Sequence, residues 1–363
     1  MRTNIIKAYL KKEFIELIRS KMFIMVYLMP SLIIFLFGYG LKLQITNART
    51  IIIDRDNTSF SRKIISSFEN SKYFDTKLLA ISDDEALKLI KQNKIDLFII
   101  IPSGFEKNLI HLKNTEIGVF IDGSFPLRAT TLEGYVKGVF LNFNKDIKFN
   151  INQRNLFNES LRDENAIIPG IIGLTLLIAP AILAALMIVK EKENGTIFNF
   201  YSSNITKTEF LIAKLTPPFI LHSINILILF LWATYWFEVP FKGSFLLYFI
   251  ASLIYVAISV GIGLLVSIIT SSQVAALVLV VIITIIPGFL YSGILMPITS
   301  MDSTSYIEAH IFPIMYYNHI IYDTFLVGSG FSSVKNIEYL VILFLYGIIL
   351  ISLGSALVKK GIK

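Results

Sequence analysis

The stretch that decides the fold is KEKENGTIFNFYSSNITKTEFLIAKL, residues Lys190–Leu215, a charged run between two long apolar segments. The segment before it is Ile167–Val189 and the segment after it is Pro217–Phe237; neither contains a lysine, arginine, aspartate or glutamate. Both are long enough to cross a bilayer, so the charged run lies against one face of a membrane. Gly195 breaks the chain, and the half-apolar Thr196–Ser202 predicts a short amphipathic helix, although a solvated loop explains the same pattern.

The composition is that of a protein embedded in a membrane. Of the 363 residues 54% are hydrophobic, whereas soluble domains average about 45–50% apolar residues. Because backbone groups in lipid must be satisfied internally, apolar runs of spanning length form helices, and we expect a polytopic α-helical membrane protein with six transmembrane helices. The predicted spans are Met22–Leu41, Ile167–Val189, Pro217–Phe237, Phe245–Ile269, Val274–Met296 and Tyr339–Val358.

Several classes of function are excluded by what the sequence lacks. The chain has no cysteine, which excludes disulfides, thiolate metal sites and a cysteine nucleophile. It contains no G-x-x-x-x-G-K-[ST], H-E-x-x-H or G-x-S-x-G pattern, so we expect no catalytic, cofactor or metal site in this chain. The first apolar run is too long for a signal peptide, and no A-x-A cleavage site follows it.

Lysine and arginine are distributed unevenly around the short loops. Only Lys242 and Lys335 lie in the short loops on one side of the predicted membrane. On the other side are Arg2, Lys7, Lys11, Lys12, Arg19, Lys21, Lys190, Lys192, Lys207, Lys214, Lys359, Lys360 and Lys363. The positive-inside bias therefore predicts that both termini and residues 190–215 are cytoplasmic. We interpret the net charge of +7 as membrane orientation and not as nucleic-acid binding.

The residues that precede the first span, 1–21, have the pattern of a surface helix. Apolar residues of Asn4–Ser20 recur at helical spacing and form one stripe, with most charges elsewhere. We expect an amphipathic helix in the headgroup layer on the cytoplasmic side; an ordinary cytosolic helix is the alternative.

Residues 42–166 differ in composition from the rest of the chain. These 125 residues hold 18 of the 33 basic and 16 of the 26 acidic residues, and strand-like and helical patterns alternate along them. This alternation predicts an α/β domain with a small, partly parallel sheet, inserted outside the membrane. Asp54 and Asp122 end two predicted strands, where α/β domains bind ligands, although acidic residues at these positions more often cap or terminate elements. The predicted strands are Thr50–Asp54, Phe74–Ala80, Asp96–Ile101 and Glu116–Asp122; the predicted helices are Ser59–Asn70, Ala86–Gln92, Phe105–Lys113 and Pro126–Asn150.

The charged run also resembles a known signature. Its first residues, Lys190–Thr196, are similar to the basic–acidic–basic–acidic–x–Gly–Thr motif of ABC-2 superfamily permeases, the membrane halves of ABC exporters. In that family this loop forms the coupling element that docks on the ATP-binding subunit. The resemblance therefore implies a coupling role for Lys190, Glu191, Lys192, Glu193, Gly195, Thr196, Phe198 and Phe200.

Two further regions resemble the same family. The inserted domain resembles the extracytoplasmic domain of one large branch of ABC-2 exporters, through residues 51–54, 101–105 and 119–123. Residues 291–297, 311–317 and 326–328 resemble the family's segment between spans five and six, although Met301-Asp302 stands where Met-Pro is usual. We expect the external segment 298–338 to form short re-entrant or interfacial helices, because polar residues interrupt Ile307–Leu326.

The resemblance implies a membrane-spanning permease subunit of an ATP-driven exporter in the inner or plasma membrane of a bacterium. ATP and magnesium would be bound by a separate ATP-binding cassette subunit, and a second permease copy or a paralogue would complete the path. The apolar, aromatic-rich spans suggest contact with membrane lipid and an amphipathic or lipophilic substrate, while no residue pattern marks a substrate site. A receptor or scaffold acting through its external domain is one alternative.

An ion-coupled secondary transporter is the other alternative. Such transporters usually need a charged residue within a span, and no aspartate, glutamate, lysine or arginine lies in the middle of any predicted span. His222 and Asn225 are the most polar side chains of the third span. A proton relay and a hydrogen bond between helices both remain possible roles for His222.

Overall fold

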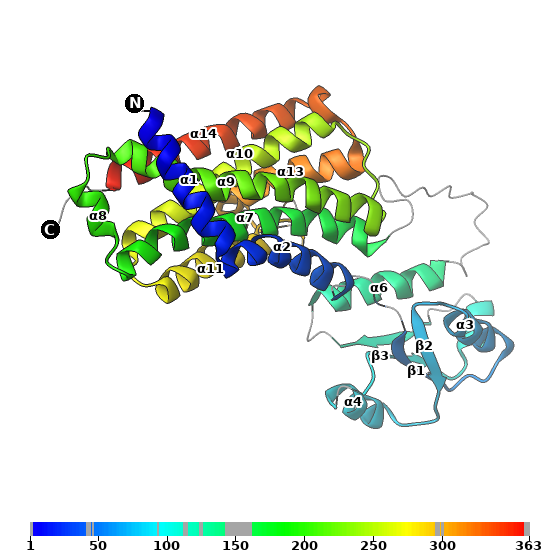
Figure 1. The fold of residues 1–363 in the computed structure, drawn as a ribbon. Coiled ribbons are helices and arrows are strands. Elements are labelled where there is room, and N and C mark those ends of the chain that lie inside the picture. Colours follow the sequence, from blue (N-terminus) through cyan, green and yellow to red (C-terminus); the bar gives the residue numbers. More distant parts are fainter. Residues whose placement is uncertain are drawn as a thin grey trace. The chain divides into compact units, whose positions relative to one another are not determined.

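The computed structural model describes residues 3–40, 45, 47–92, 94–111, 115–122, 126–141, 162–294, 298 and 301–358. The chain forms two compact units, one built from residues 1–41 and 154–363 and the other from residues 42–153 (Figure 1). The basic residues at 359, 360 and 363, the predicted helix end at 142–150 and the Met296-Pro297 step lie outside the described residues.

The first unit is a bundle of long helices. Six of the helices in the described residues are long and apolar enough to cross a membrane, which confirms the predicted polytopic α-helical architecture. The amphipathic helix predicted before the first span is α1, Thr3–Arg19. The spanning helices are α2 (Lys21–Gly40), α7 (Asp163–Glu193), α9 (Lys207–Leu231, continued by a π-helical turn Trp232–Trp236), α10 (Phe245–Ile269), α11 (Gln273–Leu290) and α14 (Val334–Leu357).

Helix α7 is the central helix of this bundle. Its apolar window is 83% buried, compared with 17% for α14 and 22% for α2, and it packs against α2, α9, α10, α11 and α13 (Pro313–Tyr322). The contact with α10 is close: a Cβ at Gly263 would lie 2.3 Å from the carbonyl oxygen of Ala181, and the Ser259 hydroxyl donates to the Leu177 carbonyl. Small residues permit such close approach of helices. Helix α7 therefore contacts most of the bundle.

Helix α9 begins ten residues before the predicted third span. The reason is a capping box: the Thr206 hydroxyl accepts a hydrogen bond from the Glu209 amide at 3.3 Å, and the Glu209 carboxylate accepts one from the Thr206 amide at 2.9 Å. Such a box satisfies two amides that a helix start leaves without partners. Pro217 and Pro218, which marked the start of the predicted span, lie inside α9. Much of the predicted charged loop is thus helical.

The polar side chains of the third span link two helices. Asn225 donates a hydrogen bond to the Val26 carbonyl of α2 at 2.8 Å, and its amide nitrogen lies 2.9 Å from Nδ1 of His222. Both side chains are buried. The contact fits a structural hydrogen bond between α2 and α9.

Short helices follow α11 in place of a seventh span. They are α12 (Ser303–Ala309), α13, a π-helical turn Asp323–Val327 and a 3₁₀ turn Gly330–Ser332. Helix α13 is buried against α7, α10 and α14, where Tyr317 stacks on Tyr255 with ring centroids 4.0 Å apart. Helix α13 is therefore part of the packed bundle.

The second unit is an α/β domain, as predicted. Its sheet has the order β2-β1-β3-β4, in which β1 runs parallel to β2 and β3, and β4 is antiparallel to β3. Alternate residues of β1 face opposite layers: Ile52 packs with Phe68 and other residues of α3 and α6, and Ile51 packs with Ala86 of α4. The elements are β1 (Ala48–Asp54), α3 (Ser59–Glu69), β2 (Phe74–Leu78), α4 (Asp83–Lys91), β3 (Leu97–Ile101), α5 (Phe105–Ile110), β4 (Gly118–Ile121) and α6 (Pro126–Leu141).

Asp54, at the end of β1, has a local structural role. One carboxylate oxygen accepts hydrogen bonds from the amides of Asp56 and Asn57, and the other accepts one from the Ser61 hydroxyl at 2.7 Å. The Asp122 amide donates to the Asp96 carbonyl at 2.9 Å. These contacts fit residues that terminate elements, the commoner of the two roles considered for acidic residues at strand ends.

Candidate functional site

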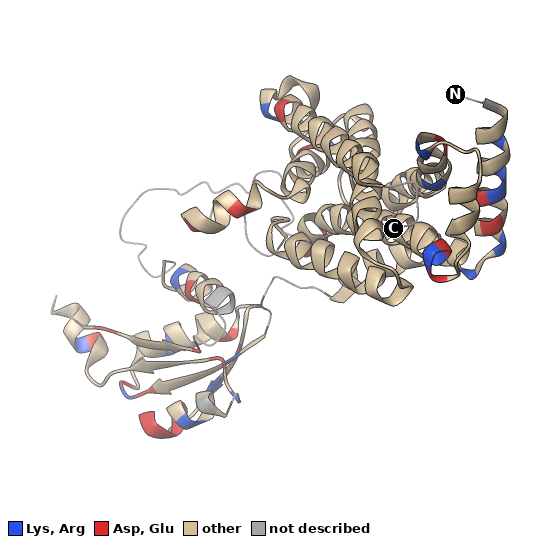
Figure 2. Ribbon diagram, turned by 90° about the vertical axis from the view of Figure 1, so that its left-hand side faces the viewer, with Lys and Arg blue, Asp and Glu red and all other residues tan. Residues whose placement is uncertain are grey.

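The candidate coupling residues lie where α7 ends, at one end of the helix bundle. Figure 2 shows charged residues gathered along α1 and at the neighbouring helix ends, while the long helices carry few of them. The four residues Lys190–Glu193 form the last turn of α7. Each of the four side chains contacts a different partner, so the run connects several helix ends.

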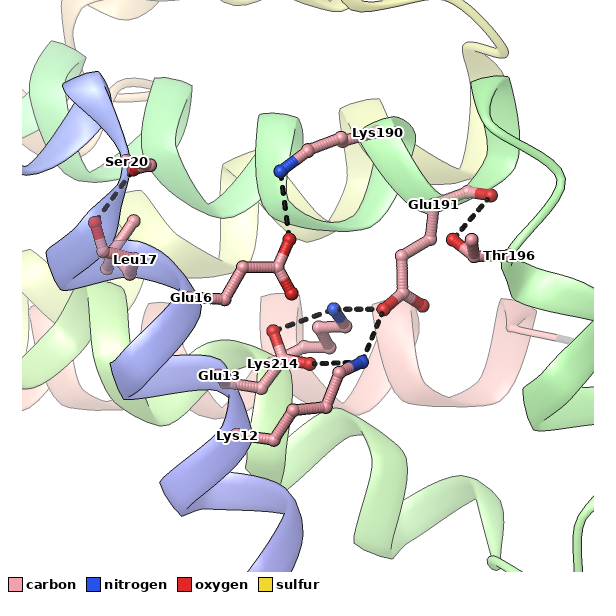
Figure 3. Close-up of polar contacts among 9 residues, drawn as sticks. All are labelled: Lys12, Glu13, Glu16, Leu17, Ser20, Lys190, Glu191, Thr196 and Lys214. Carbon is pink, nitrogen blue, oxygen red and sulfur yellow. Dashed lines mark hydrogen bonds and ion pairs between the residues drawn. The ribbon is translucent and has the colours of Figure 1, made fainter.

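Glu191 belongs to an ion cluster formed by Lys12, Glu13, Glu191 and Lys214, in which every side chain except that of Lys12, 53% exposed, is largely buried (Figure 3). The Lys214 ammonium lies 2.5 Å from the Glu191 carboxylate and 2.7 Å from the Glu13 carboxylate. Lys12 lies 3.5 Å from Glu13 and 3.6 Å from Glu191. The side chains of Lys214 and Glu13 are only 2% and 3% exposed. Buried charges are tolerated only when paired, and the two cations and two anions of the ion cluster balance each other.

The ion cluster joins three helices. Lys12 and Glu13 come from α1, Glu191 from α7 and Lys214 from α9. One turn away, Lys190 donates to Glu16 of α1 at 2.9 Å in a pair whose side chains are 36% and 47% exposed. The hydrogen bond from Lys190 is the main reason why the pKa of the Glu16 carboxyl is lowered. Helix α1 is thus held to α7 and α9 by these ion contacts, in addition to the apolar packing of Leu17 against Leu183 of α7.

Lys192 and Glu193 hold the connection between α10 and α11. The Lys192 ammonium donates to the carbonyls of Ser267, Ile268 and Thr270, where α10 ends. The Glu193 carboxylate accepts from the amide of Gln273, the first residue of α11, at 2.8 Å and from its side-chain amide at 3.0 Å. A cation at a helix C-terminus and an anion at a helix N-terminus both interact favourably with the helix dipole and stabilise the helix.

Gly195 makes the turn that follows α7. Its φ of +72° lies in the left-handed region, which glycine enters without steric cost. A Cβ at this position would meet nothing closer than Phe198 at 4.0 Å, so the constraint comes from the backbone and not from lack of space. The Thr196 hydroxyl donates back to the Glu191 carbonyl at 3.4 Å. The predicted chain break at Gly195 is confirmed.

The short helix predicted at 196–202 is α8, Ile197–Ser202. Phe198 and Phe200, the two phenylalanines of the implied coupling set, do not share one exposed face of this helix. Ile197 and Phe200 are buried, and Phe200 stacks on Phe210 of α9 with centroids 4.1 Å apart, because both pack into an apolar cluster shared with α10. Phe198, in contrast, is 52% exposed. Of the two phenylalanines in the predicted coupling set, only Phe198 is available at the surface.

A cavity of about 480 Å³ lies between α1, the end of α7, α8 and the start of α9. The ion cluster lines it, together with Tyr9, Glu16 and Phe200. The cavity thus separates α1 from α8, while the ion cluster on its wall joins α1 to α7 and α9.

Residues missed by the sequence analysis complete the site. Lys12 and Lys214 were counted there only as orienting charges, and Glu13 had no assigned role. Their contacts join residues about 200 positions apart, such as Glu13 and Lys214. No local sequence pattern indicates this pairing. The capping box at Thr206 is the sequence feature that indicates a helix beginning there, and therefore a helical Lys214.

Six spanning helices in the described residues, one of them the buried helix α7, with a charged connection at one end, fit the fold of a polytopic permease. The model of the ABC-2 family transporter proteins matches residues 21–356. The chain therefore belongs to the ABC-2 transporter family and is the membrane subunit of an ABC exporter. Permeases of this family work with ATP-binding subunits.

Relatives of similar length support this assignment. The probable multidrug ABC transporter permease YbhS of Escherichia coli K12 is 28% identical over 338 residues, which cover 89% of each chain. The probable multidrug ABC transporter permease YbhR of the same organism is 26% identical over 336 residues, covering 90% of this chain and 91% of the relative. The inner membrane transport permease YhhJ of E. coli K12 is 22% identical over 296 residues, 78% of each chain.

Proposed function

We propose that residues 190–215 are the coupling element of this permease, on which a separate ATP-binding cassette subunit docks. The observation that carries the proposal is that α8 has two different sides. Phe198 is 52% exposed, while Phe200 on the same helix is buried against α9. A docked subunit would contact the exposed side, which carries Phe198. Movement of that subunit would reach the helix bundle through the buried side, which carries Phe200. ATP and magnesium are bound by that subunit.

The last turn of α7 explains how such a displacement spreads. Glu191 contacts α1 and α9 through the ion cluster, Lys192 contacts the end of α10, and Glu193 contacts the start of α11. A shift of α8 and the α7 end therefore biases four neighbouring helix ends together. Alternating access requires two packings of the helices that the docked subunit favours to different degrees. The last turn of α7, through its contacts with these helices, would supply that bias.

The orientation follows from the positive-inside bias. Both termini and α8 are cytoplasmic, and the α/β unit at residues 42–153 is extracytoplasmic. A second copy of the permease, or a paralogue, completes the translocation path. The exposed apolar side chains of α2, α11 and α14 contact lipid and that second permease.

The substrate class proposed is amphipathic or lipophilic. Two relatives that match about nine-tenths of this chain are named as probable multidrug permeases. The spans are rich in aromatic residues and contain no mid-span charge, which suits a hydrophobic cargo better than an ion.

The experiment that tests the coupling role is the substitution Phe198→Asp. Burial of a phenylalanine contributes about 1.5–3 kcal/mol, so its loss weakens docking of the ATP-binding subunit by roughly ten- to a hundredfold. Phe331→Asp is the matched control, because Phe331 is also exposed, at 42%, but lies in the 3₁₀ turn before α14. The expected result is normal membrane insertion of both variants and loss of the co-purified ATPase and of transport for Phe198→Asp alone. Equal behaviour of the two variants would make residues 190–215 a plain connecting loop.

A further inference from the structure

A groove runs along α10 at the end of the bundle that carries α8. Helices α9 and α14 both pack against α10 but touch each other little, and the space between them has a volume of about 610 Å³. Leu215 and Phe219 of α9, Ala257 and Val260 of α10, and Ile351 of α14 line it. The lining is mainly apolar, and the small side chain of Ala257 deepens its floor. The groove has room for a flexible hydrocarbon chain.

A lysine stands at the mouth of this groove. Lys207, the first residue of α9, is half-buried and donates a hydrogen bond to the Ala356 carbonyl of α14 at 3.2 Å. Within the described part of the chain no carboxylate pairs with it, in contrast to Lys12, Lys190 and Lys214. The hydroxyls of Thr208 and Ser355 line the same end. The mouth is thus cationic and rich in hydrogen-bond donors, whereas the rest of the groove is apolar.

The dimensions match those of a lipid leaflet. The groove positions on α9 run from Lys207 to Phe219, about 18 Å along a helix that rises about 1.5 Å per residue. One leaflet is roughly half of a hydrocarbon core of about 30 Å. An acyl chain in the groove would therefore extend inward from a headgroup at Lys207.

We propose that this groove is a binding site for an anionic glycerophospholipid, with the phosphate on Lys207 and one acyl chain between α9 and α14. The choice of an anionic lipid rests on Lys207, whose ammonium meets a carbonyl but no carboxylate among the described residues. The assignment to the cytoplasmic leaflet rests on the proposed orientation, but the site itself does not depend on the coupling role of α8.

The absence of cysteine allows a direct test. A single cysteine at Ser355, labelled with bimane, places a fluorophore in the groove of the full-length permease. The permease is reconstituted into vesicles of brominated phosphatidylglycerol or brominated phosphatidylcholine, whose bromine atoms quench nearby fluorophores. The expected result is an apparent binding constant about fivefold higher for phosphatidylglycerol, the preference that one lysine gives for one net headgroup charge near a membrane surface.

Four further variants define the site. Lys207→Gln is expected to remove the preference for phosphatidylglycerol, so that the ratio of the two binding constants falls to about one. Lys335→Gln, at the opposite end of α14, is expected to leave the ratio unchanged. A label at Leu353, which is 48% exposed on α14 and does not line the groove, shows equal quenching by both lipids. Ala257→Phe fills the groove and removes quenching at Ser355 only. Equal quenching by the two lipids at Ser355, no quenching there, or a preference that survives Lys207→Gln would each overturn the proposal. Because the vesicles hold no ATPase, these outcomes do not depend on the coupling hypothesis.

Discussion

Replacing Lys214 by methionine should release α1 from the bundle. The substitution keeps most of the side-chain volume but removes the cation that lies 2.7 Å from Glu13 and 2.5 Å from Glu191. Lys12 then remains as the single cation beside two carboxylates. Removing one partner of a buried ion pair costs about 3–5 kcal/mol, since it leaves an uncompensated charge. This free-energy cost destabilises the state in which α1 packs against the bundle, because Glu13 is exposed to water once α1 has moved away. The equilibrium therefore shifts toward the open state.

The opening of α1 can be measured by cysteine labelling. Leu17 of α1 is 4% exposed and packs against Leu183 and Met187 of α7, so a cysteine there reacts with a maleimide only when α1 opens. A factor of ten in the opening equilibrium corresponds to about 1.4 kcal/mol. In the Leu17→Cys background, Lys214→Met should therefore raise the labelling rate by roughly 10²-fold to a few thousandfold.

Two further variants separate the ion cluster from a general effect of charge. Lys190→Met breaks the exposed pair with Glu16, which contributes at most about 1 kcal/mol, and should raise labelling less than about fivefold. Adding Glu191→Gln to Lys214→Met leaves the balanced pair of Lys12 and Glu13, and should lower labelling at least about tenfold from the Lys214→Met value. A labelling rate for Lys214→Met within about threefold of the parent would refute the reasoning.

Three other perturbations have defined outcomes. Gly195→Val forces a β-branched residue into the left-handed region at a cost of about 1–2 kcal/mol or more. It should lower the thermal unfolding temperature and ATPase coupling, whereas Gly195→Asn should be tolerated better. Equal unfolding temperatures of the two variants would show that the turn adapts. The contact with Lys190 depresses the pKa of Glu16, so its stabilisation is present above the ordinary value of 4.5 and is lost as the pH falls through the lowered pKa. The difference in unfolding temperature between the parent and Glu16→Gln should therefore be present at neutral pH and disappear in acid; a difference that persists there would contradict this. Export of a reporter fused after Asn150, with retention of one fused after Ser202, checks the topology, and a cytoplasmic signal from the first fusion would overturn it.

Local patterns were sufficient for the elements of this fold. Hydrophobic runs of spanning length predicted the six long helices, and the spans differ from the observed helices mainly at their ends. The break at Gly195 and the short helix after it were predicted from chain-breaking and amphipathic patterns. In the α/β unit, alternation of strand-like and helical segments predicted the partly parallel sheet. Each of these features depends on residues that are close together in the sequence.

The contacts of the candidate site could not be predicted in the same way. The motif Lys190–Glu193 indicated a family but not the partners of its charges, because Glu191 contacts Lys214 on another helix and Glu193 contacts Gln273, 80 positions away. The burial of Phe200 depends on where Phe210 lies once α9 starts at Lys207. Such pairings arise from tertiary packing, which a single sequence does not reveal.

The most direct test of the account is a crosslink from α8 to the ATP-binding subunit. In this cysteine-free chain a single cysteine at Phe198 can be labelled with a photoreactive maleimide and irradiated in the assembled transporter, with Phe331→Cys as the matched exposed control. We expect a crosslink between position 198 and a polypeptide that binds ATP, and none from position 331. No crosslink at 198, or equal crosslinking at both positions, would contradict the claim that residues 190–215 couple this permease to its ATPase.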